Sequence, residues 1–167
     1  LIASCNGDMT ARASMHNAQC LAGMAFSNAL LGIVHSMAHK TGAAYSGGHI
    51  VHGCANAMYL PKVIAFNSKN PEAAKRYGEI AAHIGLEPTA DALIRQIRNL
   101  NAQLDIPGGI QDYEGGIIDE KEFLEKLPKV AELAVGDACT GSNPRSITPA
   151  EMERLLKACY YDTEVDF

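Results

Sequence analysis

Helical periodicity is the sequence feature that most constrains the fold of this chain. Apolar residues recur every three or four positions through most of its length, first in the run from Met15 to Phe26. No segment shows the alternation of polar and apolar residues that is typical of a half-buried strand. The sequence therefore predicts an all-α protein, a bundle of about seven helices without an internal repeat.

Capping residues, prolines and glycines set the expected helix boundaries. The first helix should follow Asp8 or Thr10, and Pro61 should kink or break the third. Glycine-rich stretches at 41–48 and 107–116, together with 137–146, are expected to be connections. The expected helices after the first cover 28–40, 51–64, 71–82, 89 or 91 to 104, 119–136 and 151–160.

Length and composition limit the class of protein. A chain of 167 residues with 47% hydrophobic and 20% charged residues suits a single all-helical domain over residues 1–167. A net charge of -5 argues against nucleic acid as a partner. Polar residues interrupt the apolar stretch 21–38, which argues against a membrane span. Five scattered cysteines without a CxxC pair favour a cytoplasmic protein.

Histidines form the main candidate site. His35 and His39 are four positions apart and share a helix face, while His52 follows a glycine-rich loop. Three imidazoles that converge in this way can bind Zn(II) or Fe(II). On spacing alone, polar residues in a buried helix are the commoner explanation of such a pair. A zinc hydrolase is disfavoured because Ser36 stands where its general base would be.

Longer motifs around these histidines resemble the iron-containing (group III) alcohol dehydrogenases, including the alcohol dehydrogenase half of bifunctional aldehyde-alcohol dehydrogenases. The resemblance covers essentially the whole chain in order. It rests on MHNAQCLAGMAFSN at 15–28, GIVHSMAH at 32–39, HGCANA at 52–57, PEAAKRY at 71–77, LDIP at 104–107 and DACTGSNPR at 137–145.

The resemblance implies specific roles for the histidines. It makes His35 and His52 ligands of a single iron or zinc ion, and it places His39 in the cleft as a catalytic residue for proton relay or positioning. The loop before His52 is longer than is common in the family, and its extra His49 is a rival for His52. The family's remaining ligands, an aspartate and a histidine in a D-x3-H pattern, have no match in this chain.

Two further residues are candidates for the substrate pocket. Cys139 lies in the DACTGSNPR motif, which approaches the site in relatives, although a structural role for that loop is an equal alternative. Phe26 is the second, but an aromatic residue on an apolar helix is more often part of the core.

The resemblance implies a metal-dependent, NAD(P)-linked dehydrogenase that interconverts a primary alcohol and an aldehyde. NAD(P) would bind mainly to a separate amino-terminal α/β domain, and the chain contains no G-x-G-x-x-G fingerprint. We therefore expect a fragment that begins abruptly at Leu1, is inactive alone, and needs that missing domain as a partner, within a homo-oligomer. The alternative is a non-catalytic helical scaffold or oligomerisation module.

Overall fold

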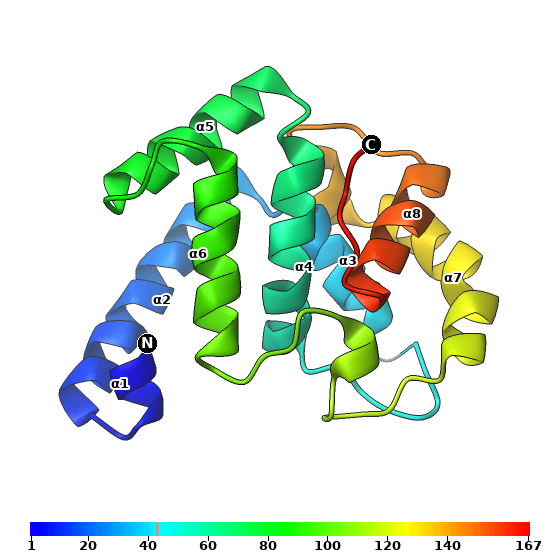
Figure 1. Cartoon of the computed structure of the whole chain (residues 1–167), viewed down its shortest axis with the longest axis horizontal. Coiled ribbons are helices and arrows are strands. Elements are labelled where there is room, and N and C mark those ends of the chain that lie inside the picture. Colours follow the sequence, from blue (N-terminus) through cyan, green and yellow to red (C-terminus); the bar gives the residue numbers. More distant parts are fainter. Residues whose placement is uncertain (43) are drawn as a thin grey trace. The chain divides into compact units, whose positions relative to one another are not determined.

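The computed structural model describes residues 1–42 and 44–167, and it is all-helical over these residues, as predicted (Figure 1). The described residues form eight α-helices and two short 3-10 helices, η1 and η2. In chain order the elements are α1 Ile2–Cys5, α2 Met9–Ala29, α3 Ile33–Thr41, α4 His52–Asn67, α5 Pro71–His83, α6 Ala90–Ala102, η1 Ile110–Asp112, α7 Glu120–Val135, η2 Ala138–Ser142 and α8 Pro149–Tyr160.

Two compact units make up the chain, Leu1–Leu31 and Gly32–Phe167, and each is described separately. The first contains α1 and α2, and the carboxylate of Asp8 caps α2 by accepting hydrogen bonds from the backbone N–H groups of Thr10 and Ala11. Two helices alone offer little interior, and α2 has no buried residue. The expectation of one domain over residues 1–167 stays a prediction.

The boundary between α2 and α3 differs from the helix predicted over 28–40. Leu30 adopts a φ of 64°, a backbone conformation that no α-helix contains, and α3 begins only at Ile33. A periodic apolar pattern continues through such a break, so periodicity alone could not show it. No single described helix is long and apolar enough to cross a bilayer, although α2 and α3 taken together meet that criterion of length and composition.

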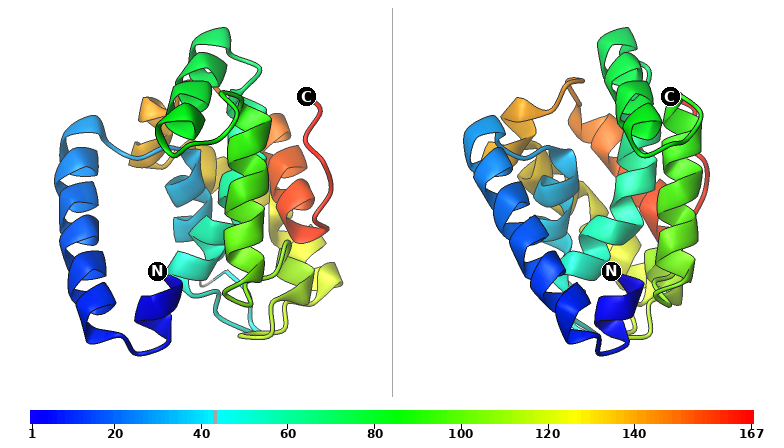
Figure 2. Two further views of the ribbon diagram at one scale, coloured as in Figure 1. Left: turned by 60° about the vertical axis from the view of Figure 1, so that its left-hand side comes forward. Right: turned by 90° about the vertical axis from the view of Figure 1, so that its left-hand side faces the viewer.

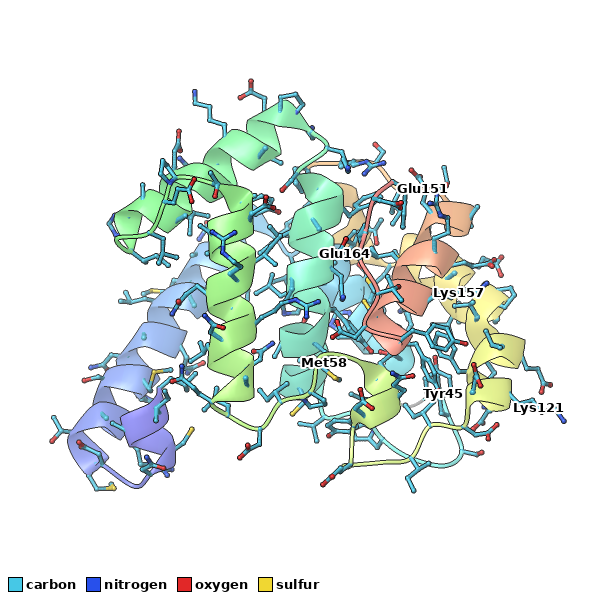
Figure 3. All side chains as sticks on the ribbon, in the orientation of Figure 1. Tyr45, Met58, Lys121, Glu151, Lys157 and Glu164 are labelled. Atoms are coloured by element: carbon cyan, nitrogen blue, oxygen red, sulfur yellow. The ribbon has the colours of Figure 1, made fainter. Side chains whose placement is uncertain are left out.

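The second unit has its core where α3, α4, α7 and α8 pack together. Met37, Tyr59, Phe123 and Leu155 from these four helices are fully buried. On the other side of α4, α6 runs alongside it, which both Figure 1 and Figure 2 show. The side chains of Lys121 and Lys157 extend into solvent (Figure 3).

Pro61 neither breaks nor ends its helix, so the break that was one of the two expected outcomes does not occur. α4 continues to Asn67, although a proline at position 61 cannot donate a hydrogen bond to the carbonyl oxygen of Ala57, four residues earlier. That oxygen instead accepts a hydrogen bond of 2.8 Å from the side-chain amide of Asn101 on α6. A partner from another helix thus satisfies the group that the proline leaves free.

Capping side chains mark the starts of four helices in the second unit. Asn70, Thr89 and Asp119 accept backbone hydrogen bonds at the starts of α5, α6 and α7. Thr148 and Glu151 form a reciprocal capping box at the start of α8. Each of these helices begins within two residues of the position predicted from the local sequence.

Candidate metal centre

Three imidazole rings meet between α3 and α4. The ring centroids of His35 and His39, one helical turn apart on α3, are separated by 6.1 Å. His52 is the first residue of α4, and its ring centroid lies 5.4 Å from each of the other two. The structure therefore brings together the three histidines that the sequence singled out.

The loop between α3 and α4 places His52 opposite α3. Gly48 forms an isolated antiparallel bridge with Gly116, and a Cβ atom on Gly48 would lie 2.5 Å from the Cα of Gly116. Only glycine permits so close an approach of two backbones. The N–H of Val51 then donates to the hydroxyl of Tyr113 at 3.3 Å, immediately before His52.

The environment of His35 favours an uncharged ring. Partial burial lowers its pKa, and the neighbouring His52 and His39 lower it further because their positive charges would repel a third. Among the described residues, no protein group forms a hydrogen bond with the ring of His35 or of His52. Both rings therefore keep a nitrogen lone pair free to bind a cation.

The donor set fits a divalent transition metal. Neutral imidazole suits Fe(II) and Zn(II). For bonds of about 2.1 Å to two imidazoles at a tetrahedral angle, the ring centroids lie about 5 Å apart. The separation of 5.4 Å between His35 and His52 is compatible with that arrangement.

Asp137 adds a carboxylate beside His39. One of its oxygens lies 3.4 Å from Nδ1 of His39 and 2.8 Å from the ammonium group of Lys40. The other oxygen accepts a hydrogen bond of 3.0 Å from the backbone N–H of Cys139. Burial opposes ionisation of Asp137, but these hydrogen bonds from Lys40 and Cys139 outweigh it and hold its pKa well below the usual range.

Cys139 lies close to this carboxylate, near the histidines. Ligand atoms of His39, Asp137 and Cys139 all fall within 4.8 Å of one another. Burial raises the pKa of the Cys139 thiol, and the hydrogen bond with Asp137 raises it further, so the sulfur stays protonated at neutral pH. With Lys40 already on Asp137, this group fits a cation less well than His35 and His52 do.

The other residues considered from sequence lie elsewhere. His49 is exposed near Gly42, at the end of α3, and it has no ring contact with the three histidines. Phe26 is exposed on α2 in the first unit, and its role in a substrate pocket stays a prediction. Sequence reasoning did not single out Asp137 or Lys40, although Asp137 is the first residue of the DACTGSNPR motif.

The chain matches a known protein family over nearly its whole length. The sequence model of the carboxy-terminal part of the Fe-containing alcohol dehydrogenases matches residues 2–160. The chain belongs to the iron-containing alcohol dehydrogenase family. Its fold is thus the carboxy-terminal helical domain of that family, as predicted.

Relatives in this family are similar over nearly all of the chain. The NADPH-dependent butanol dehydrogenase of Clostridium saccharobutylicum is 53% identical over 100% of the chain and 42% of its own length. The bifunctional aldehyde-alcohol dehydrogenase AdhE of Escherichia coli K12 is 39% identical over 90% of the chain and 18% of its own length. The chain therefore spans less than half of the length of these relatives.

Solved structures agree with the sequence comparison. The iron-containing alcohol dehydrogenase of Thermococcus thioreducens superposes with a TM-score of 0.88 at 35% identity, over 97% of this chain and 40% of the solved one. A 1,3-propanediol oxidoreductase gives a TM-score of 0.77 at 33% identity, over 92% of this chain and 39% of that one.

Proposed function

We propose that this chain is the metal-binding part of an NAD(P)-linked alcohol dehydrogenase that interconverts a primary alcohol and an aldehyde by hydride transfer. The observation that carries the proposal is the convergence of His35, His39 and His52 within 6.1 Å. Membership of the family supports the reaction class, and the similarity to a butanol dehydrogenase supports a small alcohol as substrate.

In this proposal the three histidines divide the work. His35 and His52 hold the Fe(II) or Zn(II) ion through neutral ring nitrogens, which the lowered pKa of His35 favours. A bound ion of this kind supplies Lewis-acid stabilisation of negative charge on a substrate oxygen. His39, in contact with Asp137, accepts or returns the proton of the substrate hydroxyl. Cys139 lies near enough to His39 to line the alcohol pocket.

The remaining parts of the site lie outside these residues in the proposal. NAD(P) would bind to an amino-terminal domain, and the two other metal ligands would lie on a helix before the motif at 15–28, as the family resemblance implies. Residues 1–167 alone should then bind metal weakly and catalyse no reduction of NAD(P). Alcohol-dependent reduction of NAD(P) by this chain alone would contradict that division.

A chimera tests the proposal directly. Residues 1–167 would replace the matching segment of the C. saccharobutylicum butanol dehydrogenase, to which they are 53% identical. The purified chimera should contain tightly bound metal and should reduce NADP in the presence of butanol. His35→Ala and His52→Ala should each lose most of the metal, because the site then lacks one ring nitrogen.

His83→Ala is the matched control, since His83 is exposed on α5 and has no contact with the three rings. Its metal content should equal that of the unsubstituted chimera. Unchanged metal content in both His35→Ala and His52→Ala would refute the ligand assignment. A helical, oligomeric chimera that contains no metal would instead support the alternative, a scaffold that keeps the dehydrogenase fold.

A further inference from the structure

The segment 137–143 lies against α3 in a regular register. Asp137, Thr140 and Asn143 follow one another at intervals of three residues, and most of the segment is the 3-10 helix η2, which has three residues per turn. Their side chains therefore share one face. This face lies against α3. Asp137, the first of the three residues, contacts His39 and Lys40 near the end of that helix.

The other two contacts continue the register toward the start of α3. The hydroxyl of Thr140 lies 2.8 Å from that of the fully buried Ser36 and 2.7 Å from the carbonyl oxygen of Ala134. Asn143 accepts a hydrogen bond of 3.4 Å from the backbone N–H of Ile33, where the capping residue Gly32 has no side chain to offer. Segment 137–143 thus contacts α3 near its end, at its middle and at its start.

Both ends of this contact are held firmly. Asn143 exchanges hydrogen bonds of 2.8 and 3.2 Å with Asn67 on α4 and donates a third, of 2.7 Å, to the carbonyl oxygen of Arg145. At the other end, Lys40 and the N–H of Cys139 hold the carboxylate of Asp137, whose side chain is only 10% exposed. The carboxylate therefore cannot turn away from α3 without losing these bonds.

We propose that Asp137 is a positioning residue for His39, held in place by segment 137–143. Its ionised carboxylate accepts a hydrogen bond from the Nδ1–H group of His39, which leaves the lone pair on Nε2 as the proton acceptor. The proposal deepens the proposed dehydrogenase function and rests on it for the catalytic role of His39. Among the described residues, Asp137 is the one acidic side chain in contact with the ring of His39.

Chemistry favours this tautomer over the alternative. A neutral imidazole carries its proton on one nitrogen only, and the hydrogen bond made by one nitrogen decides the state of the other. A carboxylate can only accept, so the nitrogen that faces it must carry the proton. In free histidine the Nε2–H form is preferred. An Nδ1–H form of His39 would therefore show that its ring is hydrogen-bonded to the carboxylate of Asp137.

The test is a long-range proton–nitrogen correlation NMR spectrum of the 167-residue chain at pH of about 9, where ordinary imidazoles are neutral. His39, assigned by its absence in His39→Gln, should show the Nδ1–H pattern. Asp137→Ala should convert it to the Nε2–H pattern. Thr140→Val is the matched control, because it removes the contact between Thr140 and Ser36 in the same segment. This variant should keep the Nδ1–H pattern of His39 and only lower the thermal stability.

An Nε2–H pattern in the unsubstituted chain would overturn the proposal, even if Asp137→Ala fails to fold. An unchanged pattern in Asp137→Ala would overturn it as well. In the chimera, Asp137→Ala should lower kcat by about 10- to 100-fold with full metal content. Loss of metal in that variant would point to a structural role. Since the NMR pattern requires neither metal nor turnover, this proposal and the proposed function can fail independently.

Discussion

The pairing of Asn101 with the carbonyl oxygen of Ala57 predicts an unusual dependence between two distant residues. Asn101→Ala removes the 2.8 Å hydrogen bond that satisfies this oxygen, and Pro61 offers no N–H in its place. In a Pro61→Ala background, the new N–H at position 61 can form the ordinary helical bond to Ala57. The loss in the free energy of unfolding caused by Asn101→Ala should therefore depend on which residue is at position 61.

The magnitude follows from burial. Asn101 is 9% exposed, and the hydrogen bond that it donates to Ala57 is partly buried. An unsatisfied buried polar group costs about 1–3 kcal/mol, and we expect Asn101→Ala to lower the free energy of unfolding by about 2 kcal/mol. In the Pro61→Ala background the loss should fall to about 1 kcal/mol, which gives a coupling of about 1 kcal/mol.

Urea unfolding followed by far-UV circular dichroism measures all four proteins of this double-mutant cycle. Asn99→Ala is the matched control, because Asn99 is exposed on the same helix. It should change the free energy of unfolding by less than about 0.5 kcal/mol in either background. Equal losses from Asn101→Ala in the two backgrounds would refute the role of Asn101 in keeping α4 uninterrupted at Pro61.

Three further predictions concern the second unit. Asp162→Asn should lower the free energy of unfolding in urea by about 2–3 kcal/mol. Lys62 is only 3% exposed and loses a carboxylate at 2.6 Å, although solvent partly screens that carboxylate. A smaller loss from Asp162→Asn than from Lys62→Met would contradict this. Burial opposes ionisation of Asp162, but hydrogen bonds from Arg98 and Lys62 outweigh this effect and lower the pKa of Asp162. The stability that the carboxylate contributes is therefore present above pH of about 4 and is lost as the pH falls further. Melting temperatures of the Asp162→Asn variant should accordingly vary less with pH in that acidic range than those of the unsubstituted chain. Thr148→Ala should cost about 1 kcal/mol because the capping box with Glu151 is lost, and a melting temperature equal to that of the unsubstituted chain would argue against it.

Information close along the chain predicted much of the fold. The caps at Asn70, Thr89, Asp119 and Thr148 act on backbone groups no more than three residues away, so the sequence shows both partners together. Helical spacing likewise places His35 and His39 on one face. His52 was a candidate because it follows the glycine-rich loop after α3, and the resemblance to a family then implied that it is a metal ligand.

Contacts between distant segments required the tertiary structure. Asp137 is 98 residues from His39, and Asn101 is 44 residues from Ala57. Periodicity and capping describe interactions within about one helical turn, whereas these contacts exist only after helices have packed. The sequence alone thus determined most of the helices and the candidate histidines. Packing decided that α4 continues through Pro61 and that a carboxylate lies beside His39.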